Sequence, residues 1–433
     1  MVLKLSETLG VTVMYWSRWY SFRSYIRSSL WIVPFIALLL YLGAIRAAYV
    51  LDIWIDWTPL LPWGLSGTQK VLETIITILL TFIVFTFGSL LVAIQIAGGQ
   101  LTPRIISATL LGDNAIRYTV GLFIFTLLFA TGALARLETS PRPAAAVVAS
   151  VLGFCSIAAF LYLIDYAARL LRPVSILWRV GEDGNTVIAS VYPEEARQST
   201  EERTVGQSYG SVDRTILHRG RAGIIIAVNL AALVAWARES DLLLELVPRV
   251  GDFVGPRDPL FRVYGTGTID ERRLLGAVAF GPERTLEQDP TFPFRIVVDI
   301  AIKALSKAIN DPTTAVLAID QLERLLREVG KRHLHDEELR DHSGRRRVIY
   351  RTPDWQDFVQ LSFSEIRFYG AENFQVSRRL RAMIDSLLNT LPHFRHSALR
   401  HELDILDRTI EKVYSLPDDV VLARKPDAQG LGR

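Results

Sequence analysis

The chain has 433 residues and a formal net charge of +3, and half of its residues are hydrophobic although 21% are charged. This charge is too small to indicate nucleic-acid binding. The single cysteine, Cys155, excludes an internal disulfide and a cysteine-rich metal site. The apolar runs crowd into the first 172 residues, which indicates a membrane part followed by a soluble part.

Residues 1–30 combine basic and aromatic side chains, among them Arg18, Arg23, Trp16 and Trp19. Such a segment is typical of an anionic membrane surface, with an ordinary lead into the first span as the alternative. The apolar run that follows carries no small-residue cleavage pattern, which argues against a cleavable signal peptide.

Four apolar runs predict a four-helix transmembrane domain over residues 31–172, since about 20 apolar residues cross a bilayer. The runs are about Leu30–Leu51, Thr74–Arg104, Ile116–Ala135 and Ala144–Leu163. Small residues share one face of the fourth, which predicts close helix packing, and Asp165 and Arg169 beyond it are spaced to pair. Basic residues flank mainly one side of the membrane, so both termini are predicted to be cytoplasmic.

The second run carries a stripe of polar and small residues and no charge between Thr74 and Gln100. At 100° per residue, one narrow sector contains Thr74, Thr77, Thr81, Gly88, Gln95 and Gly99, and Gln100 follows it. One interpretation is helix packing, in which threonine and glycine let backbones approach closely. The other is a wetted path through an oligomer, since polar groups within a membrane usually face protein or water.

Residues 173–292 read as a cytoplasmic β-rich module with an inserted helix over Leu230–Arg238. The predicted strands are Thr186–Val191, Gly223–Asn229, Leu242–Val247, Pro259–Val263 and Leu274–Phe280. Part of this pattern resembles the barrel-sandwich hybrid of lipoyl and biotinyl domains. No lysine occurs between Lys70 and Lys303, however, so no amine is available for a carrier group.

Residues 293–415 predict a helical region with a β-hairpin. Asn310-Asp311-Pro312 ends a first helix and begins a second. Asp299, Lys303 and Lys307 are spaced as a ladder on one helical face, either solvated or in contact with a subunit or an ion.

The rest of the chain divides into shorter elements. A charged loop is predicted over 331–350, a hairpin of Arg347–Arg351 with Asp357–Phe363, helices over 371–391 and 396–414, and a disordered tail over 416–433. The fold class is therefore an α-helical polytopic membrane protein, with four transmembrane helices followed by a cytoplasmic α+β domain that contains a small β-module.

No catalytic constellation is present. The sequence contains no Walker loop, dinucleotide fingerprint or nucleophile elbow. His393, His396 and His401 lie near two carboxylates, but their spacing matches no standard zinc pattern. We therefore predict no catalytic residue, no cofactor and no metal, and an enzyme ranks third among the functional classes.

Two segments, Leu90–Arg104 and Val298–Ala315, resemble the hallmarks of a bacterial family of predicted membrane proteins, domain-of-unknown-function family two-two-five-four. The resemblance runs from about Arg23 to about Tyr414. It departs from the family pattern at Gly98-Gly99 and at Lys307. It implies a multi-pass inner-membrane protein with a cytoplasmic tail, and it implies no activity. The signature residues of the tail are Asp299, Lys303, Asn310 and Asp311.

Two functional classes follow. The first is a homo-oligomeric channel or transport pore for an ion or small solute, lined by the second span and continued by a cytoplasmic vestibule. It needs an oligomer because four spans are too few to enclose a wide path alone. The alternative is a membrane-anchored scaffold or sensor whose cytoplasmic domain binds a partner. Either class places the chain in a lipid bilayer.

Overall fold

The computed structural model describes residues 16–17, 19–20, 26, 32–54, 64–100, 113–137, 143–170, 172–196, 211–334 and 338–431. The chain divides into two compact units. The helical unit is Tyr25–Ile176, and the mixed unit combines Met1–Ser24 with Leu177–Arg433. Most of the predicted interfacial segment 1–30 lies outside the described residues.

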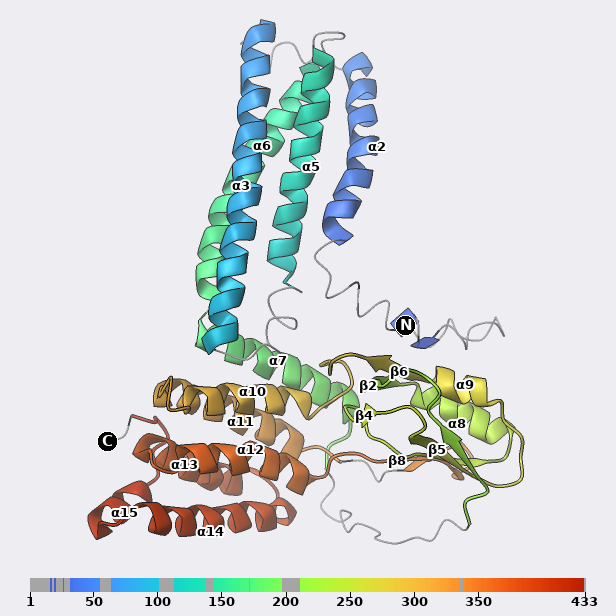
Figure 1. The fold of residues 1–433 in the computed structure, drawn as a ribbon, viewed down its shortest axis with the longest axis vertical. Coiled ribbons are helices and arrows are strands. Elements are labelled where there is room, and N and C mark those ends of the chain that lie inside the picture. Colours follow the sequence, from blue (N-terminus) through green and yellow to red (C-terminus); the bar gives the residue numbers. More distant parts are fainter. Residues whose placement is uncertain are drawn as a thin grey trace. The chain divides into compact units, whose positions relative to one another are not determined.

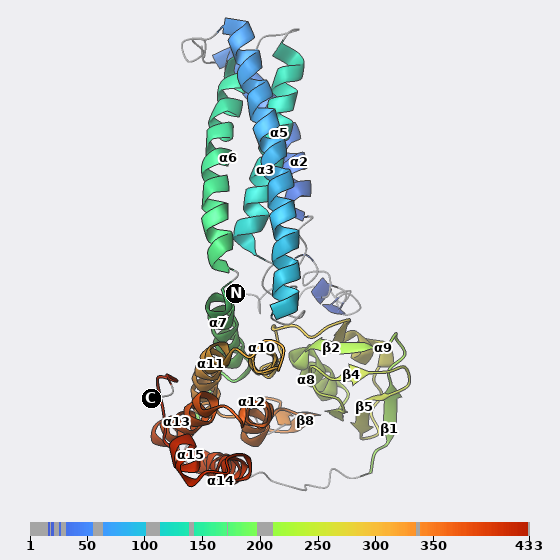
Figure 2. The same ribbon diagram turned by 60° about the vertical axis from the view of Figure 1, so that its left-hand side comes forward.

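In the described part of the helical unit, four long helices run side by side (Figures 1 and 2). They are α2 (Ile32–Trp54), α3 (Gly64–Gln100), α5 (Asn114–Leu137) and α6 (Pro143–Leu170). Helix α5 contacts the other three and is the most enclosed of the three candidate spans, with 44% of its most apolar stretch buried against 11% for α3. Phe82 of α3 stacks on Phe160 of α6, with ring centroids 3.8 Å apart.

Among the described residues, three helices are long and apolar enough to cross a membrane. They are Ser66–Gln95, Asn114–Leu137 and Ala144–Leu170. The fourth predicted span corresponds to α2, whose apolar part, Ile32–Ala48, is shorter. Membrane-spanning character is thus supported for three helices, and the four-span count stays a prediction.

The small-residue face of α6 packs as the sequence predicted. Ala145 and Ala149 are buried in a cluster with Leu72 of α3 and Phe129 of α5. A Cβ at Gly153 would lie 3.0 Å from the side chain of Ile75. The predicted ion pair between Asp165 and Arg169 is also present, on an exposed face.

Helix α7 (Pro173–Val191) corrects one predicted strand, because Thr186–Val191 forms its last turns. Leu177, Val180 and Ile188 are among its buried residues and recur at helical spacing. A Cβ at Gly184 would lie 2.7 Å from the side chain of Leu325. Tertiary packing of this face outweighs the weak strand preference of the β-branched residues.

Within the residues that the structure describes, the β-module of the mixed unit has two sheets. The five-stranded sheet has the order β1 (Arg214–Leu217), β5 (Pro259–Tyr264), β3 (Leu243–Leu246), β8 (Arg346–Tyr350) and β7 (Glu338–Arg340). Its pairings are antiparallel except for the parallel pair β3–β8. The three-stranded antiparallel sheet has the order β4 (Phe253–Val254), β2 (Gly223–Val228) and β6 (Val278–Gly281).

One hydrophobic core joins the two sheets to α8 (Leu230–Glu239) and α9 (Glu271–Gly276). The predicted inserted helix and three predicted strands are confirmed as α8, β2, β3 and β5. The strand predicted over Leu274–Phe280 is wrong at its start, because the residues up to Gly276 belong to α9. The last residues of the predicted strand lie in β6. Asp270 begins α9, since its side chain accepts a hydrogen bond from the backbone N–H of Arg272 at 2.8 Å.

Helices fill the other side of the mixed unit (Figure 1). They are α10 (Phe292–Ala304), α11 (Pro312–Gly330), α12 (Trp355–Gly370), α13 (Phe374–Thr390), the short η3 (His393–Arg395), α14 (His396–Val413) and α15 (Pro417–Ala423). The two helices expected over 371–391 and 396–414 are confirmed as α13 and α14. Helix α15 lies where the sequence predicted a disordered tail, and Arg424 after it donates to Asp407 at 3.1 Å.

The predicted hairpin is wrong in its second arm, because Asp357–Phe363 belongs to α12. A capping box explains the helix: Asp354 accepts from the backbone N–H of Asp357 at 2.7 Å, and Asp357 accepts in return at 3.2 Å. The hairpin partner of β8 is β7, which lies in the segment predicted to be a loop.

Candidate functional site

Helix α3 presents two faces that repeat every seven residues. Leu72, Leu79, Thr86 and Ala93 are buried against the helical unit. Thr74, Thr81, Gly88 and Gln95 follow the same repeat two residues later, which is about 200° further around the helix. All four are exposed, as is Thr77. The stripe therefore faces away from the other helices of its own unit.

The threonine hydroxyls of the stripe are satisfied within α3. Thr74 donates to the carbonyl of Lys70 at 2.7 Å, Thr77 to that of Glu73 at 2.9 Å, and Thr81 to that of Thr77 at 2.9 Å. Each proton points back along the helix, so the oxygen lone pairs are the polar feature left on the outer surface.

Space is open beside the middle of the stripe. A Cβ at Gly88 would meet nothing within 4 Å, whereas one at Gly121 of α5 would lie 2.4 Å from Val33 of α2. Gly121 therefore serves packing inside the unit, and Gly88 does not. Gly99 and Gln100 continue the backbone of α3, but the exposure of Gly99 and the side chain of Gln100 lie outside what the structure describes.

Helix α3 is long and apolar enough to cross a membrane. Its uncharged stretch begins after the exposed residue Glu73 and continues to the helix end at Gln100, which is about 27 residues or roughly 40 Å of helix, longer than the roughly 30 Å hydrocarbon core of a bilayer.

The signature residues Asn310 and Asp311 form the joint between α10 and α11. Asn310 adopts a left-handed backbone with φ of 49°, a conformation that asparagine tolerates better than most residues. Asp311 caps α11 by accepting from the backbone N–H of Thr314 at 3.1 Å and from its hydroxyl at 2.5 Å. The local chain geometry accounts for both residue types.

The signature residue Asp299 pairs backwards along α10 rather than with Lys303. Its carboxylate accepts from Arg295 Nε at 2.7 Å, and Arg295 also binds Glu365 of α12 at 3.0 Å. The hydrogen bond from Arg295 holds the pKa of Glu365 below its ordinary value. The predicted ladder is wrong at its end, because α10 stops at Ala304 and Lys307 lies beyond it.

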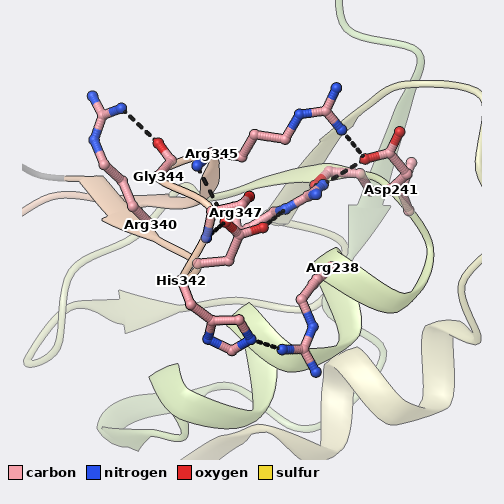
Figure 3. Close-up of polar contacts among 10 residues, drawn as sticks. Arg238, Asp241, Arg340, His342, Gly344, Arg345 and Arg347 are labelled. Atoms are coloured by element: carbon pink, nitrogen blue, oxygen red, sulfur yellow. Dashed lines mark hydrogen bonds and ion pairs between the residues drawn. The ribbon is translucent and has the colours of Figure 1, made fainter.

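An arginine network, which the sequence did not reveal, is centred on the buried side chain of Arg347 and joins the β7–β8 turn to the α8–β3 turn (Figure 3). Arg347 donates to Asp341 at 2.7 Å and to Asp241 at 2.8 Å, and Arg345 donates to Asp241 at 2.7 Å. Asp241 has a left-handed φ of 49°. The hydrogen bond from Arg347 lowers the pKa of Asp241. These contacts fix the two turns relative to each other.

The mixed unit also contains a cavity of about 870 Å³. Its walls come from the end of α7, the β2–α8 junction, the loop over 287–290 and the end of β8. Segments this far apart in the chain carry no common motif, so the sequence offered no signal for the cavity.

The histidines near the C-terminus have structural contacts. His396 is buried, with Nε2 3.0 Å from the carbonyl oxygen of Leu391, and its ring packs edge-on against that of His393. Within the described residues, no group of three or more histidine, cysteine or acidic side chains is placed to hold a metal ion.

Comparison with known proteins places the chain in a family. The profile described as "Predicted membrane protein (DUF2254)" matches residues 27–386. Uncharacterized proteins of Mycobacterium tuberculosis and Mycobacterium bovis are 25% identical over 419 residues, which is 91% of this chain and 78% of theirs. No solved structure matches. The match covers most of the chain, and the chain belongs to this family of predicted membrane proteins, as its two hallmark segments indicated.

Proposed function

We propose that the protein is a homo-oligomeric membrane protein in which copies of α3 surround a common axis and form a pore for an ion or small solute. The observation that carries the proposal is the direction of the stripe, which is polar yet lies opposite the buried face of α3. Polar groups in a membrane usually face protein or water. A second copy of α3, or water held between copies, would provide that environment.

The seven-residue repeat of the stripe supports assembly through α3. Such a repeat suits left-handed helix packing, in which the same face meets its neighbour over several turns. Gly88 lets helices approach closely near the middle, and the threonine oxygens leave acceptor lone pairs toward the axis. A closed ring of copies would place Gln95 as a ring of amides at one mouth of the pore.

The same proposal includes the bacterial inner membrane as the location, with both termini in the cytoplasm. Basic residues flanking the predicted spans support this orientation. A reporter enzyme that folds only in the cytoplasm is expected to be active when it is fused after Tyr414, and one that folds only in the periplasm is expected to be inactive there. Activity of a periplasm-dependent reporter at the same position would refute the orientation.

Flux measurements test the pore. In reconstituted vesicles, Gln95→Leu is expected to abolish the flux of potassium, chloride or a small solute that the wild-type protein carries, because it replaces the polar ring with apolar surface. Gln69→Leu is the matched control, since Gln69 lies on α3 away from the stripe and bonds to Glu73 at 2.9 Å. Equal flux through the two variants would show that Gln95 does not line the pore.

The alternative is a membrane-anchored scaffold or sensor. The internal bonding of the threonine hydroxyls favours it, because the stripe then needs no water and can serve as a packing seam alone. The cavity in the mixed unit favours a sensor, because its volume of about 870 Å³ is large enough for a small-molecule ligand. Wild-type vesicles that carry no solute under any gradient would decide for this alternative.

A further inference from the structure

We infer that the cavity of the mixed unit binds an organic anion with an apolar body, whose acidic group is held by Arg351. This inference does not depend on the proposed pore. The cavity volume of about 870 Å³ lies within the range of small-molecule sites. All of its walls belong to the mixed unit.

Apolar side chains make up much of the wall. Val228 and Leu246 come from β2 and β3, and Val234 from α8. Tyr350, at the end of β8, adds an aromatic surface. These four residues pack against or belong to the hydrophobic core of the β-module, which gives this part of the cavity a firm shape. An apolar ligand body would therefore replace water against a preformed surface.

Three arginines line the cavity, and they differ in their partners. Arg249 donates to Asp357 at 3.2 Å, and Arg340 donates to Glu338 at 3.0 Å. Arg351 is exposed at the lining, and its side chain forms no hydrogen bond or ion pair with the described part of the chain. A guanidinium in this state can offer its paired N–H groups to a carboxylate or phosphate.

Two acidic residues also line the cavity, Glu287 and Asp289. Asp289 is buried and committed to its own turn, where Oδ1 accepts from the backbone N–H of Thr291 at 3.0 Å and from its hydroxyl at 2.6 Å. Burial raises the pKa of Asp289, although hydrogen bonds from Thr291 and the charge of Arg284 oppose the rise. Arg284 also lies 3.7 Å from its other oxygen.

The N-terminal segment supplies one wall of the cavity through Trp16. Trp16 stacks on Tyr20, with ring centroids 5.3 Å apart, and both pack on Ile226, Ala227 and Ala279 of the three-stranded sheet. A bound ligand would therefore touch a segment that lies close in sequence to the first predicted span. Its occupancy is expected to change the environment of the Trp16 indole.

A matched ligand series tests the inference on the full chain in lipid nanodiscs, by isothermal titration calorimetry. The probes are indole-3-acetate, the neutral indole-3-acetamide and the cationic tryptamine, which share one apolar body. We expect the anion to bind and the other two to bind at least about tenfold more weakly, since a charge-assisted hydrogen bond is lost. Dihexanoyl phosphatidic acid, added separately, shows whether a lipid headgroup or a free acid is the preferred source of the anion.

Two variants and one control complete the test. Arg351→Gln is expected to weaken binding of the anion at least about tenfold, and Val234→Trp to abolish it by filling the cavity. Arg272→Gln removes the same charge from an exposed position on α9, outside the cavity lining, and is expected to leave binding unchanged. Thermal melts of all three exclude misfolding as the cause. Failure of both anions to bind, or equal binding by Arg351→Gln and wild type, would overturn the inference.

Discussion

Leucine at Gly121 is expected to destabilise the helical unit by about 3 kcal/mol, the upper end of overpacking costs, whereas leucine at Gly88 leaves the protomer fold intact. At Gly121 a Cβ would lie 2.4 Å from Val33 Cγ1, and the β-branched valine in a helix has little rotamer freedom with which to move. At Gly88 a Cβ would meet nothing within 4 Å.

The Gly88 variant instead separates the copies of the proposed oligomer, because it forces backbones apart along the seam. Native mass spectrometry from detergent is expected to show a smaller assembly for Gly88→Leu than for the wild type. Gly43→Leu is the control, since Gly43 of α2 is equally open and exposed but carries no stripe. If Gly88→Leu and Gly43→Leu retained the same oligomer, the seam would not lie on α3.

Alanine at Arg379 is expected to destabilise the packing of α13 on α11 by about 3 kcal/mol, the lower end for breaking a buried pair because one partner is half-exposed. The Arg379 side chain is buried, and it donates to Asp320 at 2.8 Å and to Glu323 at 2.6 Å. Its removal leaves two carboxylates without this partner. Urea denaturation of the full chain, followed by hydrogen exchange in α11 and α13, measures the loss.

The matched control is Arg408→Ala, which breaks an exposed i,i+4 ion pair whose guanidinium nitrogen lies 2.6 Å from a carboxylate oxygen of Asp404. This change is expected to lower the free energy of unfolding by less than about 0.5 kcal/mol. Arg379→Lys is expected to be intermediate, because a single ammonium cannot reproduce the two-sided guanidinium contact. Equal stability of Arg379→Ala and Arg408→Ala would contradict the structural role of this arginine.

The Arg379→Ala effect has a predicted pH dependence. Burial favours the neutral form of Glu323, but hydrogen bonds from Ser386, Arg327 and Arg379 together hold its pKa below the ordinary value. Its stabilising contribution is therefore full above the unfolded-state pKa and is lost as the pH falls through the folded-state pKa. Burial raises the pKa of Asp320 instead, and Arg379 opposes that rise. Protonation of either carboxylate removes its attraction to Arg379. The difference in the free energy of unfolding between the wild type and Arg379→Ala is therefore expected to shrink as the solution is acidified.

The sequence alone determined the features that depend on local order. The apolar runs indicated membrane helices because about 20 such residues are needed to cross a bilayer, whatever packs around them. Proline and asparagine placed the break between α10 and α11, since these residues have strong backbone preferences. The stripe on α3 could also be read directly, because helical periodicity fixes which residues share a face.

The neighbours that each helix or strand face contacts became known only from the tertiary structure. Only the packed helices show that the stripe points away from its own unit, because an apolar side chain is acceptable both to lipid and to a neighbouring helix. Thr186–Val191 and Asp357–Phe363 read as strands from their composition, yet burial of α7 and the capping box of α12 made them helices. The cavity and the parallel pairing of β3 with β8 join distant segments, and local sequence carries no record of such contacts.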